Sequence, residues 1–189
     1  MERELRFLLS KDDFYKLIEK CEFSQKYKDR ILPISWDTNG TDKWCTSFAR
    51  LRTVTKDDHT FNLFTYKAGN GIERVEIEKK LENIEFNKIF DTFDNSFLVR
   101  QEKYIIPNTK LEVKLIEIYD DDEESILDSF CCIEYEFEEN EIIDSYVVTK
   151  ILSDNNINIE LKEAAGKDQE IVSKWYSAVK IKYPDFDKE

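Results

Sequence analysis

The sequence predicts an α+β fold in which eight antiparallel strands close into a β-barrel with flanking helices. Short stretches of alternating charged and apolar residues recur along most of the chain, and several are joined by turn sequences short enough for hairpins. Other stretches carry apolar residues at helical spacing. Strands that form hairpins, with helices between them, are typical of an α+β domain, and a barrel is their simplest arrangement.

The first strand is predicted over Glu2 to Leu9, where charged and apolar residues alternate. A helix is predicted over 11–22, because Ser10 is suited to cap it and acidic residues follow in the first turn. Its apolar residues recur at i, i+3, i+4 and i+7: Phe14, Leu17, Ile18 and Cys21. A short strand is predicted over Ile31 to Trp36.

From Ser47 onward the pattern favours strands, interrupted by one short helix over 83–93. The predicted strands are Ser47–Thr55, Thr60–Lys67, Ile72–Lys80, Ser96–Ile105, Lys110–Tyr119 and Phe130–Glu138. The tail is predicted to be helical over Ile142–Leu152 and again around Ile171 to Tyr183. No shift of composition marks a boundary, so we expect a single domain over 1–189, with a barrel core at about 2–138 and C-terminal helices at about 140–183.

Composition excludes several classes of function. The 189 residues include 28 basic and 41 acidic ones, a net charge of −13, which is unsuited to holding duplex DNA. No apolar run approaches the roughly 18 residues of a membrane span, and the N-terminus is too charged for a secretory signal, so we expect a cytoplasmic protein. With a single histidine, His59, and no glycine-rich phosphate loop, the chemistry is expected to use carboxylates, cations and metal.

Charged residues lie two apart on almost every predicted strand, and residues two apart share one face of a strand. Carboxylates occupy some strands and cations others, as at Glu76 and Glu78 against Arg50 and Arg52. An ordinary sheet with a solvated polar face would explain any single strand. The whole set favours charges that point into a barrel, where a polyphosphate with divalent cations would satisfy both signs.

Six motifs in order resemble those of the CYTH superfamily, the triphosphate tunnel metalloenzymes. Glu2-x-Glu4-x-Arg6 resembles its E-x-E-x-K signature. The other five are Arg50-Leu51-Arg52, Thr65-Tyr66-Lys67, Arg74-Val75-Glu76-Ile77-Glu78, Gln101-Glu102-Lys103-Tyr104-Ile105-Ile106-Pro107 and Cys132-Ile133-Glu134-Tyr135-Glu136-Phe137-Glu138. The resemblance spans roughly residues 2–138, most of the chain.

The chain departs from the family pattern at three places. Arg6 stands where lysine is usual, and a K-x-R pair is replaced by Gln101 and Lys103. The strand over Lys110–Tyr119 normally brings an acid inward, but Glu112 and Glu117 have opposite parity, so at least one is expected to face outward unless a bulge intervenes.

The resemblance implies a metal-dependent triphosphatase that removes the terminal phosphate of inorganic triphosphate, a nucleoside triphosphate or an RNA 5′-triphosphate. It implies Mg²⁺ or Mn²⁺ as the cofactor, which suits clustered carboxylates. The expected metal ligands are Glu2, Glu4, Glu136 and Glu138. The expected phosphate-binding residues are Arg6, Arg50, Arg52, Lys67, Arg74 and Lys103. The expected catalytic residues, which would orient water, hold a second metal or fix the cations, are Glu76, Glu78 and Glu134.

Two alternatives stay open at this stage. A class IV adenylate cyclase has the same fold, and a non-catalytic module could bind polyphosphate or a nucleotide without turnover. We favour hydrolysis, because presenting water to a terminal phosphorus demands less of the nucleoside than aligning a ribose hydroxyl for cyclisation. The motifs concern only phosphate and metal, so the organic part of the substrate and the formation of a homodimer are left open.

Overall fold

The structure is a computed structural model that describes residues 2–37, 44–68, 73–92, 97–120, 124–159 and 161–163. Its strands are β1 (Glu2–Leu9), β2 (Glu22–Asp37), β3 (Trp44–Lys56), β4 (His59–Ala68), β5 (Glu73–Leu81), β6 (Phe97–Ile105), β7 (Glu112–Tyr119), β8 (Ile126–Glu136) and β9 (Lys162–Glu163). Its helices are α1 (Lys11–Ile18), α2 (Asn83–Phe90) and α3 (Tyr146–Asp154). One antiparallel sheet with helices confirms the predicted α+β class.

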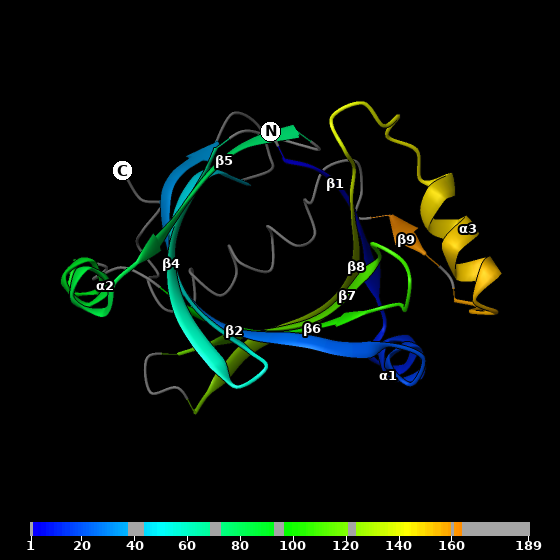
Figure 1. The fold of residues 1–189 in the computed structure, drawn as a ribbon, viewed down its shortest axis with the longest axis horizontal. Helices are drawn as coiled ribbons and strands as arrows, with labels where there is room; N and C mark the ends of the chain where they lie inside the picture. Colours follow the sequence, from blue (N-terminus) through cyan, green and yellow to red (C-terminus); the bar gives the residue numbers. More distant parts are fainter. Residues whose placement is uncertain are drawn as a thin grey trace.

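The strands form a single sheet in the order β5-β4-β3-β2-β6-β7-β8-β1-β9. The sheet is strongly curved, and Figure 1 shows β5 and β1 approaching each other across the curve. These two strands pair at Glu2↔Arg74 and Arg3↔Glu73. Within the described ranges the contact covers these two residue pairs, so closure of the barrel along its full length stays a prediction.

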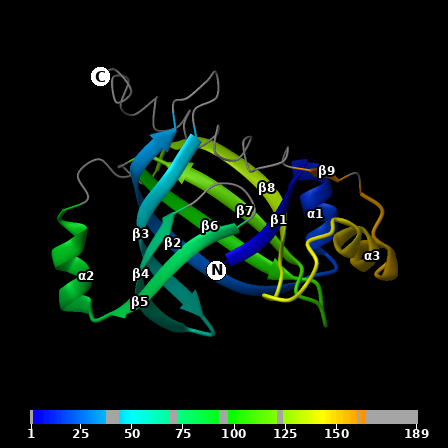
Figure 2. The ribbon, with the colours of Figure 1, turned by 90° about the horizontal axis from the view of Figure 1, so that it is seen from above.

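The helices lie on the outside of the curved sheet (Figures 1 and 2). Helices α1 and α3 cover β1, β7 and β8, where Phe14 and Val148 of the helices join Phe7 and Ile133 of the strands in the largest apolar cluster. Helix α2 covers β3 and β4, with Phe86 packed against a smaller cluster. The apolar residues of these strands therefore face outward, and the residues that alternate with them face the inside of the curve.

The predicted elements differ from the structure mainly in their bounds. Strand β1 has the predicted limits, and the hairpin between β3 and β4 turns at Asp57 and Asp58, both with the positive φ that such tight turns require. The first helix ends at Ile18 rather than at residue 22, because β2 begins at Glu22, nine residues before the predicted strand. The helix predicted around Ile171 to Tyr183 lies outside the described residues.

Helix α3 begins at Tyr146 and ends at Asp154, later at both ends than the predicted Ile142–Leu152. Strand β8 begins at Ile126 and ends at Glu136, so it is shifted toward the N-terminus of the prediction. In the part of the chain that the structure describes, no helix has the length and apolar character needed to cross a membrane.

Helix α1 should contribute to stability through its buried side. Phe14 is 1% exposed in the main apolar cluster. We expect Phe14→Ala to lower the free energy of unfolding by about 3–5 kcal/mol, because it removes a buried ring and leaves a cavity. Lys16→Ala, on the exposed side of the same helix, should change it by less than about 0.5 kcal/mol. Urea unfolding measures both, and equal effects would contradict the packing described here.

Candidate functional site

Ionised and polar side chains gather on the concave side of the sheet, opposite the helices. On β1, Leu5 and Phe7 pack beneath the helices, so Glu4 and Arg6 point the other way. We call this side the inner face. Its side chains with the ion pairs and hydrogen bonds described below are Glu4, Arg6, Asp29, Arg50, Arg52, Thr65, Lys67, Glu76, Glu78, Gln101, Lys103, Glu112, Lys114 and Glu134.

The first cluster of ion pairs joins β1, β8, β7 and β6. The Arg6 Nη2 lies 2.5 Å from Glu4 Oε1, and its Nε lies 2.8 Å from Glu134 Oε1. Lys114 pairs with Glu134 and lies 3.0 Å from Glu112 Oε2. The antiparallel register places these residues together, since Arg6 and Glu112 lie opposite Glu134 on its two neighbouring strands.

The same cluster continues to β6, where the Lys103 Nζ donates a hydrogen bond to Glu112 Oε1 at 2.6 Å. Acids and bases therefore alternate across four strands. This pairing makes the burial of so many charges tolerable, because an unpaired charge removed from water costs several kcal/mol. Of the two acids on β7 that have opposite parity, Glu112 is the one on the inner face.

The pKa values of the cluster follow from its geometry. Burial raises the pKa of Glu134, but its attraction to Arg6 and Lys114 outweighs burial and holds the pKa well below the ordinary 4.5. Burial likewise raises the pKa of Glu112, and Lys114 and Lys103 more than reverse that effect. Burial lowers the pKa of Lys114, yet Glu134 and Glu112 hold it above the ordinary 10.5. All three groups are therefore ionised at neutral pH.

The second cluster joins β2, β3 and β6 around Asp29, which is 0% exposed. Arg52 donates to both oxygens of Asp29, from Nε and Nη2, each at 2.7 Å. The amide of Gln101 donates to Asp29 Oδ2 at 2.6 Å. The Arg52 guanidinium also lies 4.0 Å from the centre of the Tyr27 ring. Arg50 of β3 is more distant, with its Nη1 3.9 Å from Asp29 Oδ2. One buried carboxylate thus contacts two arginines of β3 and an amide of β6, and Arg52 makes the shortest ion pair.

Strands β4 and β5 add a third group with longer contacts. Glu76 Oε1 lies 3.3 Å from Lys67 Nζ and 3.9 Å from Arg50 Nη2. Glu78 accepts a hydrogen bond from the Thr65 hydroxyl at 3.4 Å. Lys67 also lowers the pKa of Glu134 by its charge, although β4 and β8 are far apart in the strand order. The curvature of the sheet therefore brings this third group within electrostatic range of the first cluster.

The structure brings together most of the predicted site residues and leaves Glu138 apart. Glu4, Glu134 and the cations of β1, β3, β4 and β6 lie on the inner face, as described above. Glu136, at the end of β8, is exposed but lies opposite Glu4 across the pairing of β1 with β8. Glu138 lies beyond that strand, exposed and paired with Lys110 at 2.5 Å. The side chains of Glu2 and Arg74 are not among those described, although their backbones pair between β1 and β5.

Metal-ligand geometry is only partly present in what the structure describes. Among the described residues, no group of three or more His, Cys, Asp or Glu side chains is close enough to hold a metal ion. The carboxylates of Glu4 and Glu134 nevertheless both approach Arg6, so their oxygens lie near one place on the inner face.

Sequence reasoning missed Asp29 entirely. The predicted strand began only at Ile31, whereas β2 starts at Glu22 and carries Asp29 on its inner face. Parity gives no signal for it, because the residues two positions away on either side, Tyr27 and Ile31, are uncharged. Glu112 and Lys114 lie two residues apart, on one face of the predicted strand Lys110–Tyr119, but neither is among the expected site residues.

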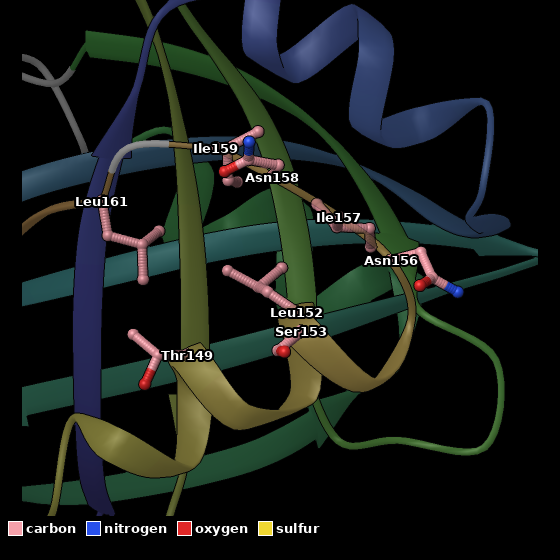
Figure 3. A pocket seen from close by; sticks show the side chains of 8 residues that line it. All are labelled: Thr149, Leu152, Ser153, Asn156, Ile157, Asn158, Ile159 and Leu161. Carbon is pink, nitrogen blue, oxygen red and sulfur yellow. The ribbon is translucent and has the colours of Figure 1, made fainter.

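A pocket of about 660 Å³ lies beside α3 (Figure 3), on the outer side of the sheet. Its lining residues are Thr149, Leu152, Ser153, Asn156, Ile157, Asn158, Ile159 and Leu161. None of them carries an ionisable side chain. The pocket therefore lacks the chemistry that the inner face has, and we place the candidate site on the inner face.

Solved structures with a similar fold include two proteins with a TM-score of 0.56. The PH1819 protein of Pyrococcus horikoshii OT3 is 21% identical, and the match covers 92% of this chain and 99% of that one. HpAC1 of Hippeastrum, named as an adenylyl cyclase and found to have a dominant triphosphatase activity, is 12% identical, with 93% and 96% covered. No family model and no curated protein matches the sequence. At these identities the neighbours show that the chain shares their fold.

Because of the ion pairs of Glu134, the free energy of unfolding should depend on pH in the acidic range. Its folded pKa lies below the ordinary 4.5, so its contribution is complete above that pH and is lost as the pH falls through the lower folded value. We expect Glu134→Gln to cost about 1–3 kcal/mol at pH 7, and the difference from the wild type to shrink below about pH 4.5.

Urea unfolding between pH 7 and pH 3 would measure this difference. The control is Glu136→Gln, which removes an exposed carboxylate two residues along the chain. A Glu134→Gln variant as stable as the wild type at pH 7, or a difference that grows in acid, would contradict the role of this ion pair.

Proposed function

We propose that this chain is a divalent-metal-dependent triphosphatase that hydrolyses the terminal phosphate of inorganic triphosphate, a nucleoside triphosphate or an RNA 5′-triphosphate. The observation that carries the proposal is the inner face, where buried or partly buried cations from five strands face buried and partly buried carboxylates. Buried ion pairs are weak evidence for a purely structural role, because a protein in which apolar residues of similar volume replace them is often as stable or more stable. A ligand that carries many negative charges together with metal cations matches both signs.

The curved sheet is proposed to close into a tunnel around that ligand. The pairing of β1 with β5 joins the two ends of the strand order, apart from the short β9. The charge interaction between Lys67 of β4 and Glu134 of β8 is consistent with closure, because closure brings β4 and β8 nearer through β5 and β1. A tunnel would shield the phosphates from water, which strengthens every charge interaction inside it.

The phosphate-binding residues are proposed to be Arg6, Arg50, Arg52, Lys67, Arg74 and Lys103. Arg50 and Lys67 are both buried on the inner face, where Glu76 Oε1 lies 3.9 Å from Arg50 Nη2 and 3.3 Å from Lys67 Nζ. A phosphate oxygen at hydrogen-bond distance would interact with them more strongly than Glu76 does. The arginines could bind two phosphate oxygens at once.

The metal site is proposed to include Glu4 with Glu2, Glu136 and Glu138. Mg²⁺ in proteins commonly takes only one or two carboxylates, and substrate phosphates and waters complete its shell. Glu4 and Glu136 fit this pattern, because they lie opposite each other across the pairing of β1 with β8, and Glu4 is buried on the inner face. When bound, the cation would neutralise phosphate charge and activate the attacking water. Glu138 would have to leave Lys110 to take part.

Glu76, Glu78 and Glu134 are proposed to orient water or hold the phosphate-binding cations in place. Their contacts in the structure are with Lys67, Thr65 and Arg6 respectively. The dominant triphosphatase activity of HpAC1, a protein of the same fold, is in line with hydrolysis rather than cyclisation. The proposed location is the cytoplasm, as the composition predicts.

The proposal predicts which products form. Tripolyphosphate, ATP and 5′-triphosphorylated RNA would be incubated with the protein and Mg²⁺, Mn²⁺ or EDTA, and the products separated by chromatography. We expect release of orthophosphate from at least one of them with metal and none with EDTA, and ADP as the product from ATP. Cyclic AMP with pyrophosphate would instead identify a cyclase. Tripolyphosphate binding without any product would identify a binding module.

Lys67 offers a sharper test of the site itself. It is buried on the inner face, and a hydrogen bond to a charged group is worth about 1.5–3 kcal/mol. We therefore expect Lys67→Gln to lower kcat/KM on the order of 10- to 100-fold. The control is Lys26→Gln, which removes the same charge from an exposed side chain paired with Glu102. Equal kinetics in the two variants would contradict the inner face as the active site.

A further inference from the structure

Asp29 is the most deeply buried carboxylate among the described residues, and no motif of the sequence includes it. Its side chain is 0% exposed, and it lies at the centre of the second cluster, between β3 and β6. A buried carboxylate with both oxygens bonded is held in a single orientation. Asp29 is therefore a fixed point on the inner face rather than a mobile counter-ion.

The bonds of Asp29 fix the orientation of Arg52. The bidentate contact uses the Nε and Nη2 atoms, each 2.7 Å from a carboxylate oxygen, and the Tyr27 ring lies against the guanidinium at 4.0 Å. A guanidinium carries five N–H donors in one plane, so the edge formed by its two Nη atoms points away from Asp29. That edge has the geometry to donate to two phosphate oxygens.

Gln101 suits this arrangement because it is uncharged. Its amide donates to Asp29 Oδ2 at 2.6 Å, the same oxygen that accepts from Arg52 Nη2. A lysine or arginine at this position would compete with Arg52 for the carboxylate. The amide instead completes the bonds of Asp29 and leaves the ion pair with Arg52 intact.

We propose that Asp29 is a positioning residue for triphosphate recognition, which holds Arg52 in the orientation that binds phosphate and is itself held by Gln101. This inference rests on the proposed function and names a residue outside the family-like motifs. Because Asp29 acts through Arg52, its loss should impair binding even though it makes the inner face more positive. A role limited to neutralising charge would give the opposite result, tighter binding of the anion.

Asp29→Asn separates these outcomes, since it removes the charge and one acceptor while keeping the shape. Binding of tripolyphosphate by calorimetry, with and without Mg²⁺, is the readout. We expect the dissociation constant to rise on the order of tenfold. The matched control is Glu102→Gln, the same change of charge next to Gln101 on the outer face, which should leave the constant within about twofold. Unchanged or tighter binding by Asp29→Asn overturns the positioning role.

A double-mutant cycle tests whether Asp29 acts through Arg52. In an Arg52→Gln background, Asp29→Asn should produce little further loss of tripolyphosphate affinity, whereas independent roles would give additive losses. If Asp29→Asn does not fold, as judged by circular dichroism, Gln101→Leu replaces it. That variant removes one bond to Asp29 and should weaken binding a few-fold, while unchanged affinity overturns the inference.

The wild-type protein distinguishes this inference from the proposed function. A wild type that binds no tripolyphosphate overturns both. A wild type that binds it, together with an Asp29→Asn variant of equal affinity, overturns only the role of Asp29.

Discussion

An ionised group that leaves water must find a partner, and this requirement governs the inner face of the sheet. Each buried charge described here lies against an opposite one, and acids and bases alternate from β1 through β8 and β7 to β6. The arrangement holds the strands in register as well as the charges in place. Glu76 lies 3.9 Å from Arg50 and 3.3 Å from Lys67, and a phosphate oxygen at hydrogen-bond distance would interact with these cations more strongly than Glu76 does.

The fold and the site depend on the same alternation of side chains. The outer helices cover the apolar side chains Leu5, Phe7 and Ile133. Because neighbouring residues of a strand point to opposite faces, the side chains of Glu4, Arg6 and Glu134 point inward. The outer helices therefore contribute to the site without touching it. The amphipathic character of α1, with Phe14 and Leu17 buried, is part of what keeps β1 in position.

The fold class and much of the inner face could be predicted from sequence because alternation is a local signal. Strand β1 begins and ends where its alternating residues do. Arg50, Arg52 and Lys67 stand out by parity together with the resemblance to known motifs. The first half of β2 could not be found this way, because Lys26, Tyr27 and Lys28 show no regular alternation of apolar and polar residues. This part of the strand is held extended by its pairing with β3 and β6, which the local sequence does not reveal. Asp29 lies in this part and was therefore missed.

Parity also fails where a strand stops. The rule that aligned Glu134, Glu136 and Glu138 assumes an extended chain, but β8 ends at Glu136. Beyond that point Glu138 is free of the alternation and pairs with Lys110 on the surface. The ends of strands are fixed by hydrogen bonds to neighbouring strands, which a single stretch of sequence does not reveal.

The alternation of inward and outward side chains along β3 limits where the sequence can gain or lose residues. Leu51 is 1% exposed beneath the outer covering, and Arg50 and Arg52 on either side of it point inward. Inserting or deleting one residue within this strand would exchange the two faces, so that two arginines would enter the apolar layer and a leucine the charged one. Changes in chain length are therefore far better tolerated in turns such as the one at Asp57 and Asp58 than within the strands that carry the site.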